Sequence, residues 1–180
     1  LDWSLKQVSS TEIIGHRISR SWAQNQHFYF YLQTSNDIDI VECYSSDIKD
    51  STKLALRFID LKDGELMVKV GISAVSIEGA KENLLSEANH WEFNKYKYQA
   101  QLKWERALSK MDVSDANQDK KTIFYTALYH SMIAPNIFND VNGDYRGTDL
   151  KVHHSKENTY TIFSLWDTFR ATHPLYTLIE

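Results

Sequence analysis

The chain has 180 residues, of which 42% are hydrophobic and 13% aromatic, enough apolar material for one ordinary domain or for parts of two. Its formal net charge is −4, from 20 basic and 24 acidic residues, so it lacks the excess of Lys and Arg that binds a nucleic-acid backbone. It has no run of about 18 apolar residues and therefore no predicted membrane span, and its single cysteine excludes an internal disulfide and a CxxC pair.

The first part of the chain, residues 4–73, has the period of two that is typical of strands. Residues 27–34 are rich in aromatic side chains, and residues 38–42 alternate apolar with acidic side chains, so both segments are predicted to be strands. Cys43 ends this alternation and is interpreted as a small buried hydrophobe rather than a nucleophile.

Two apolar arms flank a turn signal later in this part. Residues 54–59 and 66–72 lie on either side of Asp63-Gly64, a dipeptide suited to the positive φ angles of a tight hairpin turn. We therefore predict that the two arms pair with each other. In the second arm every other residue is apolar, so one face should be buried in an antiparallel sheet or sandwich; that face consists of Leu66, Val68, Val70 and Ile72.

After Ser76 the period becomes that of a helix. Ser76 is a suitable N-cap for a helix that continues through residues 80–85. A second helix is predicted over residues 93–111, where apolar side chains recur at spacings of three and four and are interpreted as core. A third is predicted over residues 122–132, ending before Pro135.

The rest of the chain divides into a long loop and a last helix. Residues 136–160 are polar and contain glycine, and loops of this length are often functional. Residues 161–179 have a helical pattern that Pro174 is expected to kink or divide. The boundary between the strand-rich and the helical part is predicted at residues 73–79.

The richest group of aromatic and charged side chains lies in this last segment. Trp166 and Arg170 are four residues apart and share a helix face, and Asp167 can pair with Arg170. An indole can stack on the flat C–H face of a sugar, while a carboxylate can accept bonds from two neighbouring hydroxyls. Spacing alone favours a different interpretation, a buried Trp beside a structural Asp–Arg pair.

A second candidate is the segment 139–147, where acid and amide side chains alternate as they do in calcium-binding loops. An EF-hand that starts at Asp140 would need Gly at the position of Tyr145 and Glu at the position of Lys151, so the EF-hand pattern does not fit. Asn142-Gly143 better suits a tight turn.

Other polar side chains carry weaker signals. His153 and His154 are adjacent, so their rings should diverge, and they are interpreted as exposed loop residues rather than metal ligands. Tyr125 and Tyr129 share a helix face and either line a wet groove or pack with their hydroxyls bonded. We assign no residue of this chain as a catalytic acid or base or as a metal ligand.

The order of motifs along the chain resembles glycoside hydrolase family 92, a family of exo-acting, calcium-dependent bacterial α-mannosidases. The resemblance extends over nearly the whole chain and is carried by residues 124–131, Pro135, residues 140–147 and residues 160–175, and upstream by residues 15–19, 22–23, 28–30, 69–73 and 80–84. Because Leu1 is not Met and Glu180 falls at the end of a predicted helix, we expect an internal fragment of a longer chain.

The resemblance implies an α+β fold in three parts. Residues 1–75 would be the trailing part of an antiparallel β-sandwich, residues 76–120 linking helices, and residues 121–180 the first helices of a truncated (α/α)6 catalytic barrel. The implied activity is release of terminal mannose from α-mannosides with inversion, by a secreted, periplasmic or cell-surface bacterial enzyme acting on mannose-containing glycans. Calcium would assist, but its ligands and the catalytic carboxylates would come mostly from the remainder of the parent chain, so the fragment alone should be inactive.

The resemblance also reverses the interpretation of the last segment. It implies that Trp166 and Asp167 form the wall and the hydroxyl acceptor of a subsite for the terminal mannose, with Arg170 as an orienting partner. A family loop that contains Asp140, Tyr145 and Arg146 is expected to shape the barrel mouth. Two alternatives stay open: a noncatalytic carbohydrate-binding or scaffold module, and another (α/α)6 glycosidase such as a glucoamylase-like hydrolase.

Overall fold

The computed structural model describes residues 2–45, 52–59, 61 and 64–179. The chain forms two compact units: unit 1 comprises Leu1–Trp91 and Phe138–Thr159, and unit 2 comprises Glu92–Ile137 and Tyr160–Glu180. The chain therefore passes between the units three times. All named strands lie in unit 1 and most helices in unit 2, which confirms the predicted α+β class. The predicted domain limits at residues 75 and 120 do not coincide with these unit boundaries and stay predictions.

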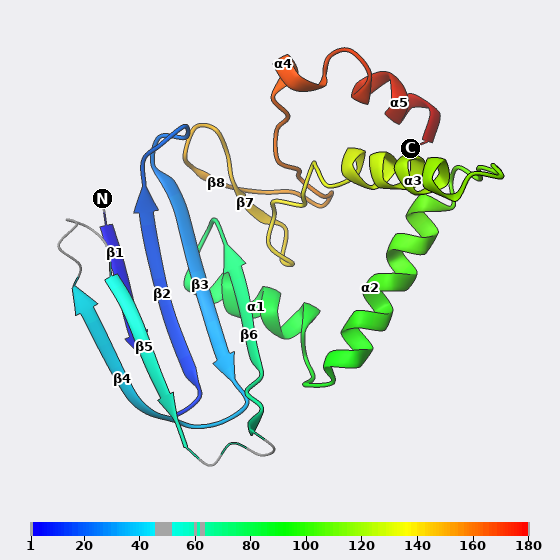
Figure 1. Ribbon diagram of the computed structural model, residues 1–180. Coiled ribbons are helices and arrows are strands. Elements are labelled where there is room, and N and C mark those ends of the chain that lie inside the picture. The colour runs from blue at the N-terminus through cyan, green and yellow to red at the C-terminus, as the bar shows by residue number, and fades with distance from the viewer. Residues whose placement is uncertain (1, 46–51, 60, 62–63, 180) are drawn as a thin grey trace. The chain divides into compact units, whose positions relative to one another are not determined.

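Unit 1 is built on a four-stranded antiparallel sheet with the strand order β1-β2-β3-β6 (Figure 1). Its strands are β1 (Asp2–Gln7), β2 (Glu12–Ser19), β3 (Gln26–Thr34) and β6 (Val68–Ser73). One row of paired residues crosses the sheet from Lys6 to Ile14, Tyr31 and Gly71. Since side chains alternate across a strand, the members of this row share one face.

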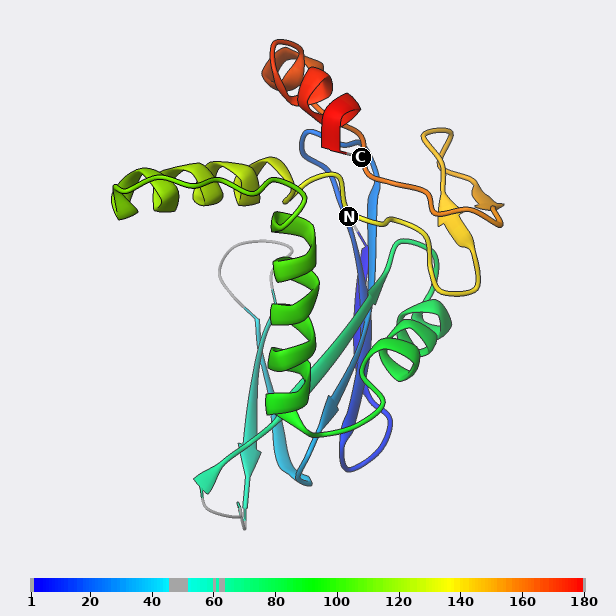
Figure 2. The same ribbon diagram turned by 90° about the vertical axis from the view of Figure 1, so that its right-hand side faces the viewer.

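One buried cluster of unit 1 lies between this face and the helix α1 (Ile77–Glu87), which Figure 2 shows along one side of the sheet, while Ile13, 1% exposed, is buried on the opposite face. Tyr31 is 1% exposed, Ala80 0% and Leu84 4%, and these three side chains pack together. A Cβ atom added at Gly71 would lie 2.1 Å from the carbonyl oxygen of Ala80. The close packing of β6 on α1 therefore requires glycine at position 71.

The last turn of α1 is tied to the sheet by Lys69. Its Nζ donates to the carbonyl oxygen of Ala88, the C-cap residue, over 2.8 Å, and lies 4.1 Å from the centre of the Trp91 ring. Burial lowers the pKa of Lys69. A cation interacts favourably with the negative C-terminal end of a helix and with the face of an indole ring. Both contacts of Lys69 therefore stabilise the packing of α1 on the sheet.

The predicted hairpin around Asp63-Gly64 is wrong. Asp63 lies outside the described residues, and Gly64 has the positive φ of 72° that a turn of this kind needs. The flanking strands nevertheless pair elsewhere: β5 (Thr52–Phe58) pairs with β4 (Ile38–Ser45) in a separate two-stranded sheet, and β6 pairs with β3 (Figure 1). The connection from Phe58 to Val68 is long enough to carry the chain from one sheet to the other.

The burial predicted for β6 is also wrong. Val68, Val70 and Ile72 are 48%, 51% and 55% exposed, whereas Gly71 and Ser73 on the opposite face are buried. The alternation identified the two faces of β6 correctly. The helix α1 nevertheless covers the face that carries Gly71, because glycine allows the helix to approach the strand closely. Cys43 belongs to β4, and its side chain lies outside the described part of the chain.

The described residues of unit 2 form the helices α2 (Phe93–Leu108), α3 (Gln118–Ser131), α4 (Leu165–Thr168) and α5 (Thr172–Ile179). The apolar stripe of α2 is covered only in part, where the Trp104 ring meets the Tyr129 ring of α3 at 4.5 Å, and Phe93 is 70% exposed. None of the residues of α2 is buried, so the predicted core over residues 93–111 is wrong at Phe93 and Ala100, which are exposed, and is only half-buried at the other apolar positions of this stripe. None of the helices in the described ranges is long and apolar enough to cross a membrane.

The helix predicted over residues 161–179 is two helices, α4 and α5. The break falls at residues 169–171, and Pro174 lies in the first turn of α5. Backbone N–H groups in the first turn of a helix make no intrahelical hydrogen bond, so a proline, which lacks this N–H, costs little there. Pro174 is therefore compatible with α5.

Candidate functional site

Trp166 and Asp167 lie side by side on the short helix α4. Ser164 is its N-cap residue, and the carbonyl oxygen of Ser164 accepts the N–H of Asp167 over 3.0 Å and the Oγ1 hydroxyl of Thr168 over 3.1 Å. The Trp166 side chain is 84% exposed, and Asp167 is exposed as well. The interpretation of Trp166 as a buried side chain beside a structural Asp–Arg pair is therefore wrong. Both side chains are accessible to a ligand in solution.

The predicted ion pair between Asp167 and Arg170 does not form within the described part of the chain. Arg170 instead lies with its guanidinium carbon 5.5 Å from the centre of the Phe169 ring. The reason is that α4 ends at Thr168, so Arg170 falls in the following turn and loses the helical spacing that the prediction assumed. The structure thus leaves the neighbouring Trp166 and Asp167 exposed on α4 and Arg170 apart from the carboxylate.

A cluster of aromatic side chains holds α4 from its other side. The hydroxyl of Thr168 is hydrogen-bonded to Nε2 of His173 over 2.9 Å. The His173 ring packs edge-on against Phe163 at 5.2 Å, and Phe163 lies 5.9 Å from Tyr176, whose hydroxyl donates to the Ala134 carbonyl oxygen over 2.8 Å. These contacts are made by partly buried residues and fix α4 to α5 and to the end of the α3 segment.

The predicted loop over residues 136–160 contains a hairpin that the sequence patterns missed. It consists of β7 (Asp144–Arg146) and β8 (Val152–His154). The turn before β7 is the one predicted at Asn142-Gly143, since the N–H of Gly143 donates to the Asp140 carbonyl oxygen over 2.9 Å. Strands of three residues are too short to show a period of two, so only the turn signal was available.

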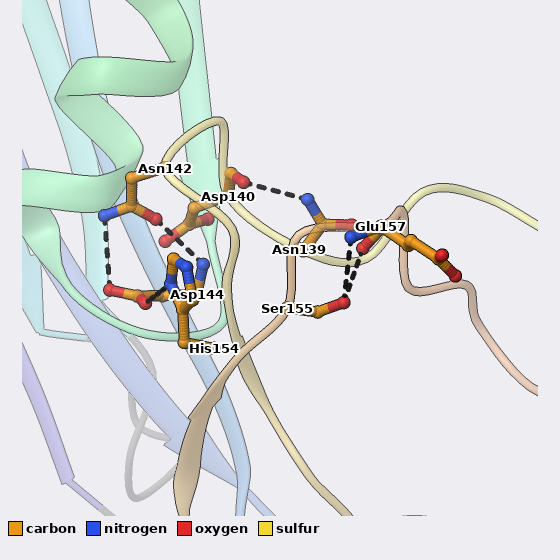
Figure 3. A network of polar contacts seen from close by, with 7 residues as sticks. All are labelled: Asn139, Asp140, Asn142, Asp144, His154, Ser155 and Glu157. Atoms are coloured by element: carbon orange, nitrogen blue, oxygen red, sulfur yellow. Dashed lines mark hydrogen bonds and ion pairs between the residues drawn. The ribbon is translucent and has the colours of Figure 1, made fainter.

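The two histidines of β8 diverge, as predicted. His154 is hydrogen-bonded through Nδ1 to Asp144 over 2.9 Å, and Figure 3 shows the Asn142 amide on the same carboxylate. His153 lies on the other face, where its Nε2 contacts Asp149 over 2.9 Å and lowers the pKa of that exposed carboxyl. Among the described residues, no group of three or more His, Cys, Asp or Glu side chains could hold a metal ion.

Asp140 and Arg146 both contact the connection between β6 and α1. Asp140 is 2% exposed, and its carboxylate accepts hydrogen bonds from Ser73 over 2.7 Å and from Asn83 over 2.8 Å. Arg146 donates through Nε to the Ala74 carbonyl oxygen over 2.8 Å. The third predicted residue, Tyr145, has its ring 5.6 Å from that of His153. All these partners belong to unit 1, and a role at a barrel mouth stays a prediction.

Of the two tyrosines on the shared face of α3, Tyr125 combines the two roles left open for them. Both line a groove of about 470 Å³ between α2 and α3, together with Leu108 and Thr122. The Tyr125 hydroxyl nevertheless accepts the N–H of Val113 and donates to the Met111 carbonyl oxygen, each over 3.2 Å. The Tyr125 hydroxyl is thus committed to the fold, while Tyr129 packs its ring against Trp104.

Solved structures of known function share this fold. BT3965 from Bacteroides thetaiotaomicron, a family GH92 α-mannosidase, is similar with a TM-score of 0.82 and 32% identity over 97% of this chain and 26% of its own. A structure of the same enzyme in complex with mannoimidazole gives the same TM-score and identity, over 97% of this chain and 25% of its own. BT2199 from Bacteroides thetaiotaomicron VPI-5482, a family GH92 inverting mannosidase, has a TM-score of 0.81 and 24% identity, over 96% of this chain and 25% of its own.

The chain thus spans about a quarter of the length of these relatives. Among curated protein sequences, none matches it. The sequence model of the glycosyl hydrolase family 92 catalytic domain matches residues 79–180, more than half of the chain, and this range includes Asp140, Trp166 and Asp167. The match confirms the family that the order of motifs indicated. The chain belongs to glycosyl hydrolase family 92.

Proposed function

We propose that the protein carrying this chain is an exo-acting α-mannosidase that releases terminal mannose with inversion from mannose-containing glycans. Family membership supports this proposal and removes the alternative of another (α/α)6 glycosidase family. In the same proposal residues 121–180 open a catalytic barrel, and the protein is secreted, periplasmic or on the surface of a bacterium.

We propose further that Trp166 and Asp167 form part of the subsite for the terminal mannose. The observation that carries this assignment is their joint exposure on α4, a helix that is held from its opposite side by Thr168 and His173. The indole offers a plate for the C–H face of the sugar, and the ionised carboxylate accepts hydrogen bonds from adjacent hydroxyls. Arg170 lies on Phe169 and would contribute only as an orienting residue.

Inverting hydrolysis needs a general acid and a general base about 6.5–9.5 Å apart, with the attacking water held by the base. We assign neither role to a residue of this chain. Calcium, which the family resemblance implies, does not fit the described residues alone, since they contain no group of three acidic, His or Cys side chains around one point. We propose that its ligands and the catalytic carboxylates come from other segments of the complete protein.

The test is the substitution Asp167→Ala in the complete protein that carries residues 1–180. Loss of a hydrogen bond between a charged group and a sugar hydroxyl costs about 1.5–3 kcal/mol, so kcat/KM for an α-mannoside should fall by about 10- to 150-fold. Asp112→Ala is the matched control, because Asp112 is an exposed Asp in the same unit. Equal activity of the two variants would contradict the assignment.

The remaining alternative is a noncatalytic carbohydrate-binding module. It would bind mannose without releasing it from a glycan, so calorimetric titration with mannose beside a mannose-release assay separates the two functions. Nothing in the described part of the chain favours the module, whereas membership of a glycosyl hydrolase family favours the enzyme, and we therefore propose the enzyme.

A further inference from the structure

The connection between β6 and α1 is a polar corner whose donors and acceptors are nearly all used. Ser73 Oγ accepts the backbone N–H groups of Val75 over 2.8 Å and of Ser76 over 3.2 Å, and its own hydrogen goes to Asp140. Ser76 in turn accepts the N–H of Gly79 over 2.9 Å as the N-cap of α1. The Asp140 carboxylate therefore completes the network at the N-terminal, positive end of a helix.

Asn83 fixes the second oxygen of Asp140. Its Nδ2 donates to Asp140 over 2.8 Å and to the Ile72 carbonyl oxygen over 2.9 Å, while its Oδ1 accepts the N–H of Val141 over 2.8 Å. Each group of this amide thus has the partner that its chemistry requires, and a flipped amide would lose all three bonds. Because Asp140 is 2% exposed, water does not substitute for a lost partner.

Arg146 holds the carbonyl groups of the same corner. Nε donates to Ala74 over 2.8 Å and Nη2 to Val75 over 3.2 Å, while Nη1 reaches Leu150 of its own hairpin over 2.8 Å. Asp140 accepts hydrogen bonds from the donors of the corner, and Arg146 donates to its carbonyl acceptors. Asp140 lies 67 residues after Ser73, and Arg146 lies 72 residues after Ala74. We call Asp140 and Arg146 the clasp.

Gly79 shows that the clasp needs a close approach of the hairpin to α1. A Cβ atom at this position would lie 2.2 Å from Oδ2 of Asp140. Any larger residue at position 79 would therefore push the carboxylate away from Ser73 and Asn83.

The two chain segments that leave the hairpin are hydrogen-bonded to each other. Within unit 1, the N–H of Phe138 donates to the Thr159 carbonyl oxygen over 2.7 Å. Within unit 2, Ile137 and Tyr160 form an isolated antiparallel bridge, and the N–H of Thr161 donates to Asn136 over 2.9 Å. We call residues 136–139 and 159–161 the stem; α4 begins at Leu165, shortly after its second segment.

We propose that Asp140 is a positioning residue for the mannose subsite: the clasp anchors the hairpin, and the paired stem restrains the segment that carries Trp166 and Asp167. The inference rests on the proposed function, because it needs those two residues to contact the sugar. Asp140 itself touches neither residue of the subsite, and it acts through the backbone of the stem.

The test compares Asp140→Asn with Asp149→Asn in the complete protein. An amide at position 140 keeps the shape of Asp, but its NH2 group must face Ser73 or Asn83. Both of these residues donate hydrogen bonds to Asp140, so a donor would face a donor and one hydrogen bond would be lost. Asp149 lies on the same hairpin, is exposed, and its carboxylate is hydrogen-bonded to His153 and to the backbone N–H of Lys151. Hydrogen exchange of the Thr159 and Thr161 amides and the KM for an α-mannoside are measured in both variants.

In Asp140→Asn the stem amides should exchange on the order of tenfold faster, and KM should rise with a smaller change in kcat, while Asp149→Asn behaves like the wild type. Unchanged exchange in Asp140→Asn would overturn the clasp, and faster exchange with unchanged KM would overturn the positioning role. If Asp140→Asn fails to fold, Arg146→Lys, which loses the forked contact with Ala74 and Val75, is judged by the same criteria. If Asp167→Ala keeps full activity, the proposed function fails, and the exchange data still decide whether the clasp restrains the stem.

Discussion

Gly71→Ala should separate α1 from the sheet of unit 1. The added Cβ atom would lie 2.1 Å from the Ala80 carbonyl oxygen and 2.8 Å from Cβ of Leu84, whereas carbon and oxygen atoms normally stay about 3.3 Å apart. Since the oxygen belongs to helix backbone, α1 has to retreat by about 1 Å, and a gap of that size removes up to about half of a packing contact. Half of the usual cost of a Leu→Ala cavity, with some strain, is about 2–3 kcal/mol.

Native-state hydrogen exchange of the β6 and α1 amides in the complete protein measures this loss, because local opening becomes easier by the same free energy. A cost of about 2–3 kcal/mol corresponds to exchange about 30- to 150-fold faster. Gly64→Ala is the matched control: no atom of the described residues lies within 4 Å of its added Cβ atom, so the expected cost is the strain of its positive φ, about 1 kcal/mol. If Gly71→Ala accelerates exchange of these amides no more than Gly64→Ala does, the packing argument is wrong.

Two further substitutions test local features of unit 1. Ser76→Ala removes the N-cap acceptor of the Gly79 N–H and should cost about 1 kcal/mol, seen as about fivefold faster exchange of the first-turn amides, whereas Ser76→Gly should cost only a few tenths. Burial, with the charges of Arg146 and His16, lowers the pKa of His27 below its ordinary 6.5, so the unfolded chain binds that proton first and stability should fall as pH drops below about 6.5. In His27→Gln the slope of Tm against pH between about pH 8 and 5 should be smaller, and equal slopes would contradict this.

The strands and helices themselves could largely be predicted, because their signals are local. The aromatic run at residues 27–34 became β3, and Ser76 caps α1 as its position before the helical period indicated. The pairing of strands could not be predicted in the same way. Gly64 has the backbone of a turn, yet β6 pairs with β3 and β5 pairs with β4, because the partner of a strand depends on contacts distant in sequence that a local pattern does not contain.

The candidate site could be predicted only as neighbours in sequence. Trp166 and Asp167 can be identified from the motif that contains them, but their exposure cannot. The helical pattern also does not show that α4 ends at Thr168, and for this reason the expected Asp167–Arg170 pair is absent among the described residues. The position of Asp140 was beyond prediction, because its partners Ser73 and Asn83 lie 67 and 57 residues earlier. Its loop carried a turn signal but no sign of what the buried carboxylate contacts.

The hairpin β7–β8 belongs to unit 1 but follows the first segment of unit 2 in the sequence. This order of segments constrains how the two units can fold during synthesis. Ser73 and Asn83 leave the ribosome 57 to 67 residues before Asp140, a delay of about 3 to 13 s at synthesis rates of about 5–20 residues per second. During that time the corner between β6 and α1 has no carboxylate to bind. The helices α2 and α3 of unit 2 are synthesised in the same interval. The nascent units therefore cannot be completed one after the other, and the N-terminal unit is finished only after the second has begun to form.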